Sequence, residues 1–197
     1  MNIKKMTDVI TFEFNKEMDK KLSASNINKA STLVQKSLVA RAIVRTLQGF
    51  DRNSNSFKGY SKSYARRKKD ILKNKYKGSY YAKLKAARGT YKYSASSVND
   101  KIRLSGELLG NLSARQKSIK VNKNILLMKF EMYVNNIKSS YAKHTIAQRG
   151  YWLEKQGYKW FGSSRAGKFK TRDQDAINKI ILKALGFEVT SKGVKFK

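Results

Sequence analysis

Hydrophobic and polar residues alternate over residues 8–14 of the chain. Ile10, Phe12 and Phe14 fall on one side of an extended backbone, and polar side chains fall between them. A period of two residues is typical of a strand that buries one face. The alternation therefore predicts a β-strand over residues 8–14.

The period changes in the next segment, residues 30–47. Apolar residues recur there at steps of three and four, while basic side chains fill the other positions, and Gly49 can end the segment. The spacing predicts an amphipathic helix over residues 30–47. Its apolar positions are Ala30, Leu33, Val34, Leu38, Val44 and Leu47.

Residues 50–100 have a different character, because a polar loop gives way to basic and tyrosine-rich sequence. Ser61 is a candidate N-cap for a short helix that reaches about Lys75. Residues 76–95 alternate Tyr with Lys or Arg, and their apolar content is low. We expect an extended basic insertion here, in which residues 58–93 lie outside the core, are disordered in the isolated monomer and become ordered by contact with partners.

The clearest hairpin signal lies between Ile119 and Val134. Hydrophobic residues alternate from Leu126 to Val134, and polar residues 122–124 form the turn before them. A compact apolar element at residues 102–109 precedes this hairpin, and residues 139–149 have a helical pattern.

The last part of the chain predicts a helix and a second hairpin. Thr171 and Gln174 have the spacing of a capping box, an apolar stripe follows, and Gly186 can cap the end. Residues 187–189 and 194–196 read as paired strands. Helices and hairpins without regular βαβ alternation imply an α+β fold.

We therefore expect one α+β domain over residues 1–197, in which a long N-terminal helix and a C-terminal helix pack on an antiparallel sheet. Residues 50–100 would be an extended insertion within it. The inward positions of the periodic elements should form one core. These positions are Ile10, Phe12, Leu33, Leu38, Leu126, Met128, Phe130, Met132, Ile177, Ile181 and Leu185.

Charge adds a strong constraint, since 44 Lys and Arg against 13 Asp and Glu give a formal net charge of +31. An AT-rich genome would favour Lys and Asn and would fit the absence of Pro, but it should also supply Asp and Glu. The depletion of acids is therefore informative. A chain with this charge repels itself unless it lies against nucleic acid phosphates or acidic protein neighbours.

The residue inventory argues against most catalytic and metal sites. The chain has no Cys, and its single His, His144, cannot form a set of imidazole ligands. No Walker A or Gly-x-Gly-x-x-Gly pattern occurs, and no nucleophile is paired with His144 in the sequence. The carboxylates of a metal-dependent nuclease are not evident either. We predict no enzymatic activity, no metal and no cofactor.

The ends and the hydropathy indicate the compartment. No segment approaches the roughly 20 consecutive apolar residues of a membrane span. The first residues lack the apolar region of a signal peptide. We expect synthesis in the cytoplasm and no membrane insertion.

Tyrosines interleaved with cations over residues 58–93 form the candidate interface. Such a segment suits single-stranded nucleic acid, where rings stack on bases and cations contact phosphates. Tyr and Arg equally anchor protein interfaces, so the composition leaves both partners open. The candidate residues are Lys58, Tyr60, Tyr64, Arg66, Arg67, Lys68, Lys69, Tyr80, Tyr81, Arg88 and Tyr91.

Three blocks of the chain resemble the tail-completion and head–tail joining proteins of bacteriophages, also called virion morphogenesis proteins. The first, residues 57–68, reads Phe-Lys-Gly-Tyr-Ser-Lys-Ser-Tyr-Ala-Arg-Arg-Lys, and the second, residues 104–112, reads Leu-Ser-Gly-Glu-Leu-Leu-Gly-Asn-Leu. The third has Tyr-Ala-Lys-His at residues 141–144, Gly150, and Trp-Phe-Gly at residues 160–162. The blocks follow the order of the family, although the family usually carries Pro in the first and third. The motif residues are Gly106, Glu107, Leu108, Tyr141, Ala142, His144, Gly150 and Phe161.

The resemblance implies a structural virion protein that forms a homo-oligomeric ring at the neck or tail of the particle. Its partners would be the portal or connector, the tail tube or the tail terminator, with non-specific contact to genomic DNA in the channel. The motif residues would then have structural roles, and the protein would be made in the host cytoplasm. The competing interpretation is a basic nucleic-acid-binding protein associated with a genome or with ribosomes, for which the charge alone would suffice.

Overall fold

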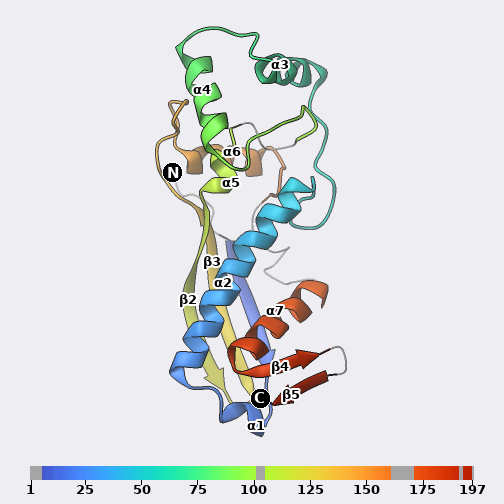
Figure 1. Ribbon diagram of the computed structural model, residues 1–197, viewed down its shortest axis with the longest axis vertical. Helices are drawn as coiled ribbons and strands as arrows, with labels where there is room; N and C mark the ends of the chain where they lie inside the picture. The colour runs from blue at the N-terminus through green and yellow to red at the C-terminus, as the bar shows by residue number, and fades with distance from the viewer. Residues whose placement is uncertain (1–5, 101–104, 161–170, 191–192, 197) are drawn as a thin grey trace. The chain divides into compact units, whose positions relative to one another are not determined.

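The computed structural model describes residues 6–100, 105–160, 171–190 and 193–196 (Figure 1). They contain helices and an antiparallel sheet without βαβ units, which confirms the predicted α+β class. The chain divides into two compact units, each described separately below. Among the described residues, the first unit comprises 42–100, 105–113 and 133–160, and the second comprises 6–41, 114–132, 171–190 and 193–196. The single domain over residues 1–197 stays a prediction.

A three-stranded sheet is the centre of the second unit. Its order is β1 (Met6–Glu13), β3 (Ile125–Val134) and β2 (Leu112–Asn122), and the ends of β2 and β3 continue into the first unit. β1 pairs antiparallel with β3, so that Ile10 lies opposite Met128 and Phe12 opposite Leu126. The predicted first strand and the predicted hairpin are therefore confirmed.

The long helix α2 (Ala24–Leu47) begins six residues before the predicted helix. Within the second unit it is tied to β2 by polar contacts: the Ser31 hydroxyl bonds the Gln116 side chain, and the Gln35 amide donates to the Ala114 carbonyl at 2.6 Å. Its buried stripe runs through Ala30, Val34 and Leu38, at steps of four residues.

Ten of the eleven predicted core positions are buried, and Leu33 is the exception, with 39% of its surface exposed. The prediction for Leu33 was wrong because the face of α2 that packs inward carries Ser31, Val34 and Gln35. Ser31 and Gln35 bond residues of β2, and Val34 between them is buried. After Ala30, a step of three residues leads to Leu33 and a step of four leads to Val34, and both fit the spacing of a helical stripe. In the structure the stripe follows the step of four. The predicted core positions that are buried all lie in the second unit.

The C-terminal elements also belong to the second unit. α7 (Thr171–Ala184) buries Ile177 and Ile181, and the antiparallel pair β4 (Phe187–Thr190) and β5 (Gly193–Phe196) follows. The Gln174 amide donates to the Thr11 carbonyl of β1 at 3.0 Å. Both elements were predicted, although the Thr171 side chain, and with it the predicted capping box, lies outside the described residues. A short helix, α1 (Lys16–Asp19), follows β1 and is capped by Asn15.

The first unit contains α3 (Lys62–Leu72), α4 (Ser79–Thr90), α5 (Glu107–Gly110) and α6 (Ile146–Lys155). Ser61 caps α3, as its sequence predicted. No helix was predicted over residues 76–95, and α4 lies there. Leu84 and Ala87 of α4 bury against Tyr141, so this part of the chain does have an apolar cluster of its own.

The helix predicted over residues 139–149 begins later in the structure. α6 begins at Ile146, behind a capping box in which Thr145 accepts from the Gln148 backbone and Gln148 accepts from the Thr145 backbone. Residues 139–144 lie before it without helical structure, and their polar groups are used in contacts described below.

Candidate functional site

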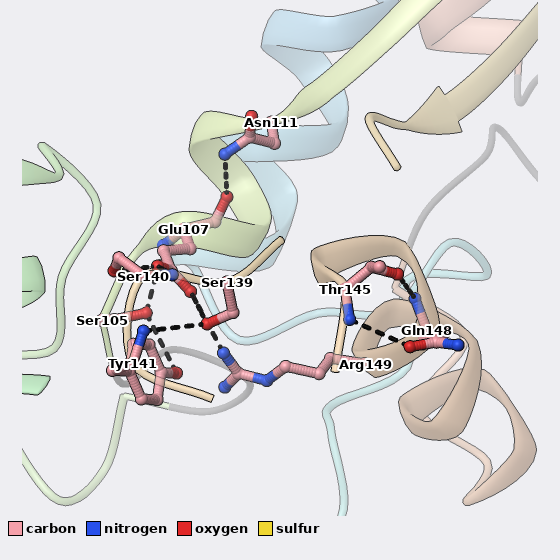
Figure 2. A network of polar contacts seen from close by, with 9 residues as sticks. All are labelled: Ser105, Glu107, Asn111, Ser139, Ser140, Tyr141, Thr145, Gln148 and Arg149. Carbon is pink, nitrogen blue, oxygen red and sulfur yellow. Dashed lines mark hydrogen bonds and ion pairs between the residues drawn. The ribbon is translucent and has the colours of Figure 1, made fainter. Parts of the chain in front are cut away.

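A buried carboxylate lies at the centre of the first unit (Figure 2). Glu107 is fully buried, and its two oxygens accept hydrogen bonds from the Ser139 hydroxyl at 2.7 Å, from the Ser140 backbone at 2.8 Å and from the Ser140 hydroxyl. Arg149 completes the set, with a guanidinium nitrogen 3.2 Å from the carboxylate. A buried charge is tolerated when it is paired and hydrogen-bonded, and Glu107 meets both conditions.

The network reaches into the loop before α6. The Ser105 hydroxyl bonds the Tyr141 hydroxyl at 3.1 Å, and the Arg149 guanidinium lies 4.7 Å from the centre of the Tyr141 ring. The side chain of Asn111 donates to the Glu107 carbonyl at 2.9 Å, which closes the turn of α5. Glu107 thus joins α5, the 139–141 loop and α6 into one polar cluster.

Two glycines let these segments come close together. Gly106 has φ of +82°, and a Cβ there would lie 2.6 Å from the Ser94 backbone nitrogen. Gly150 of α6 packs beneath Leu108 and Trp160, whose side chains would lie 3.1 Å and 3.2 Å from an added Cβ. The two motif glycines therefore have a steric role, one in a left-handed turn and one at a helix contact.

A cleft of about 720 Å³ opens beside this cluster, and all of its described lining residues belong to the first unit. Six aromatic side chains and one imidazole line it, from the first and third motif blocks, from α4 and α6, and from the segment after α6. They are Tyr60, Tyr64, Tyr80, Tyr141, His144, Trp152 and Tyr158. The inner part of its wall is apolar, since Leu109 and Ile146 line it and are 2% and 1% exposed.

The charge of the cleft is one-sided. Lys58 and Arg149 line it, and among its described lining residues there is no Asp or Glu. Lys58 lies 5.2 Å over the ring of Tyr158, and its amine donates to the Gln156 carbonyl at 2.7 Å. Burial raises the pKa of the Tyr141 hydroxyl above its usual value, while Arg149 and the Ser105 hydrogen bond oppose the shift. This hydroxyl is therefore neutral at physiological pH. Glu107 balances the charge of Arg149, so Lys58 provides the remaining positive charge of the described lining.

Ten of the eleven predicted interface residues fall into three groups. Lys58, Tyr60, Tyr64 and Tyr80 line the cleft. A second group is exposed on α3, outside the cleft, and consists of Arg66, Arg67 and Lys69. A third group makes contacts inside the unit: Tyr81 stacks on Tyr76 with ring centres 4.9 Å apart, Arg88 donates to the Ile71 carbonyl at 3.4 Å, and Tyr91 packs against Gly106 and Gly110.

Lys68 corrects the prediction that the whole basic run is a contact surface. It is only 1% exposed, its amine donates to the Asp100 carbonyl, and it lies 4.9 Å over the Tyr60 ring. The helical step places Lys68 on the inward side of α3 while its neighbours face outward. Lys68 is therefore a structural residue.

The motif residues of the second and third blocks meet in one place. Glu107 and its neighbour Ser105 bond the segment that carries Tyr141 and Ala142, and Gly150 packs under Leu108. Gly106 lies between Ser105 and Glu107, in the turn before α5. His144 is exposed beside the cleft, its ring edge-on to Trp152 with centres 4.4 Å apart. Phe161 lies outside the described residues.

Sequence reasoning missed the residues that hold Glu107. They are Ser139, Ser140 and Arg149. No sequence pattern marks them, because the burial of Glu107 that makes these partners necessary is seen only in the structure. Trp152 and Tyr158, which line the cleft, belong to an aromatic-rich stretch that the sequence indicates as core packing or interface.

No helix among the described residues is long and apolar enough to cross a membrane. Groups of three or more His, Cys, Asp or Glu side chains that could hold a metal ion do not occur in that part of the chain either. The chain matches no protein-family model, no curated protein and no solved structure. The motifs and the geometry of the first unit are therefore the basis for any functional assignment.

Proposed function

We propose that the chain is a structural protein of a bacteriophage particle, a ring-forming neck or tail-completion component that joins the portal or connector to the tail. One observation supports this most strongly: the three motif blocks, which are far apart in the sequence, converge in the first unit. Tyr60 and Tyr64 of the first block line the same cleft as Tyr141 of the third. Glu107 of the second block accepts hydrogen bonds from the segment that opens the third.

Convergence carries weight because the blocks were identified from the sequence alone, by their order and spacing. Short similarities that arise by chance have no reason to share a site, whereas the motif of a common fold marks residues that pack together. In this proposal the role of the blocks is architectural: Glu107 and Gly106 fix the base of the cleft, and Gly150 allows α6 to approach.

The exposed cations provide contacts for assembly. Rings are built from heterologous interfaces, in which one surface of each copy meets a different surface of the next. With a formal net charge of +31, copies of this chain repel unless acidic neighbours compensate the charge. The outward cations of α3 would lie against acidic virion proteins or against DNA in the channel.

The proposal is tested by the mass of the purified full-length chain after nuclease treatment in high salt. Native mass spectrometry and negative-stain microscopy should then show closed rings of identical copies, or rings that form when the adjoining virion protein is added. A chain that stays monomeric at every concentration, with and without the other proteins encoded beside it, contradicts the proposal.

A nucleic-acid-binding protein is the second candidate, favoured by the exposed cations Arg66, Arg67 and Lys69 on a helix flanked by tyrosines. Binding to phosphates releases counterions, so its affinity falls steeply with salt. The two candidates differ in what salt removes: high salt strips nucleic acid from a nucleic-acid-binding protein, while protein contacts with apolar cores persist.

A further inference from the structure

We infer that the cleft of the first unit is a docking site for an acidic segment of a different protein, held by an apolar side chain inserted between the tyrosines. This inference deepens the proposed function, on which it rests, by naming the surface through which the chain would bind its neighbour. It is carried by the shape, the lining and the charge of the cleft.

Some of the side chains that line the cleft are buried, and others are exposed to solvent. Tyr141, Tyr158, Leu109 and Ile146 are at most 6% exposed, while Tyr64, Tyr80 and Trp152 are 43%, 42% and 37% exposed. An apolar side chain that enters between the exposed rings would therefore reach a buried apolar wall. Aromatic residues that are part exposed and part packed are the usual anchors of protein interfaces.

The charge of the side chains that line the cleft indicates which kind of partner it would bind. Lys58 and Arg149 line the cleft without an acidic residue among the described lining side chains. The Lys58 amine uses one of its three protons on the Gln156 carbonyl, and Arg149 gives one nitrogen to Glu107. Lys58 therefore offers both charge and donors to carboxylates of an incoming segment. Arg149 offers its remaining N–H donors, since Glu107 balances its charge, and Tyr hydroxyls add neutral donors beside them.

A second copy of this chain is a poor occupant, because the chain has only 13 acidic residues against 44 basic ones. Single-stranded nucleic acid fits less well than an acidic peptide for a geometric reason. Bases need open, roughly parallel ring faces. Here the Tyr60 and Tyr64 rings are tilted by 57°, the Tyr80 and Tyr141 rings by 67°, and cations already cover one face of Tyr60, Tyr141 and Tyr158.

The test uses the full-length chain and an array of synthetic peptides that combine Asp and Glu with Leu, Phe or Trp. Matched arrays replace the apolar residues with Ser or the acids with Lys, and oligothymidylate represents single-stranded nucleic acid. Binding is measured by isothermal titration and by the fluorescence of Trp152, with Trp152→Phe as the control for the signal. Circular dichroism confirms that each variant is folded.

Two charge reversals separate the cleft from the general field of the protein. Lys58→Glu changes the cleft, and Lys69→Glu makes the same change on the exposed side of α3. We expect acidic peptides with apolar anchors to bind, Lys58→Glu to weaken them about tenfold or more, and Lys69→Glu to weaken them less than about twofold. Loss of binding in the Ser-substituted array would show that the apolar anchor is needed.

Three results would overturn the inference: no acidic peptide in the array binds, both reversals weaken binding equally, or oligothymidylate binds more tightly and displaces the peptides. These results leave the proposed function testable on its own. Rings that form while acidic peptides fail to bind remove only the docking inference, whereas peptide binding by a chain that never assembles removes only the proposed function.

Discussion

Glu107→Ala tests the most specific feature of the first unit, the buried carboxylate that joins α5, the 139–141 loop and α6. Removal of this side chain leaves the Ser139 hydroxyl, the Ser140 backbone N–H and the Arg149 guanidinium without their acceptor. Loss of one partner of a buried ion pair costs about 3–5 kcal/mol. The Arg149 side chain is 30% exposed and can turn toward water, so the lower end applies, about 3 kcal/mol.

The assay follows from the positions of the tryptophans. Both Trp152 and Trp160 lie in the first unit, so their fluorescence during urea unfolding reports this unit and not the other. With an m-value of about 1.5 kcal/mol/M, a loss of about 3 kcal/mol lowers the urea midpoint by about 2 M. Glu107→Gln keeps one acceptor and should give a smaller shift, which is useful if the alanine variant fails to fold.

Glu13→Gln is the matched control, since Glu13 is exposed on β1 in the other unit. Its free energy of unfolding should stay within about 0.5 kcal/mol of the wild-type value. If Glu107→Ala and Glu13→Gln shifted the tryptophan-detected midpoint by the same small amount, the carboxylate would not hold the three segments together and the reasoning would be refuted.

The remaining predictions concern a glycine, a tyrosine and the basic helix. Gly106→Ala should cost about 3 kcal/mol, against about 1 kcal/mol for Gly157→Ala, because both have positive φ but only Gly106 would overlap a neighbouring backbone; equal midpoints in urea would contradict this. Burial raises the Tyr141 pKa, so the folded chain holds that proton longer, and its contribution to stability is complete below pH 10.0 and lost as the pH rises through the folded pKa. Tyr141→Phe should flatten this alkaline loss in thermal unfolding, and an unchanged pH profile would count against it. Serine at the exposed positions Arg66, Arg67 and Lys69 of α3 should change the free energy of unfolding by less than about 0.5 kcal/mol per site. Lys68→Ser alone should cost about 1–3 kcal/mol in the same unfolding assay.

The sheet unit was predictable because its elements have strict periods. The alternation of β1 and β3 fixes which residues face inward, and the turn at residues 122–124 joins β2 to β3. The pairing of β1 with β3 did not follow from the sequence, because the two strands are more than 100 residues apart. Leu33 was misplaced because an amphipathic stripe allows a rotation of the helix by part of a turn, and the polar contacts of Ser31 and Gln35 that set this rotation involve residues distant in sequence.

The first unit was less predictable, since it is held by polar contacts and by close packing at glycines. The sequence marks Gly106, Glu107 and Tyr141 as a motif but does not reveal that Ser139 and Arg149 are the partners of the carboxylate. Likewise, the low apolar content of residues 76–95 hid α4, whose two buried residues, Leu84 and Ala87, need Tyr141 from a later segment to form a cluster.

The central claim, a structural role in joining head and tail, is tested most directly by a stop codon in the gene within the genome that encodes it. Electron microscopy of the resulting lysate should show heads and tails that accumulate separately, and supply of the wild-type chain in trans should restore joined particles. Joined, infectious particles at normal yield in the absence of the chain, or a genome that produces no particles at all, would contradict the account.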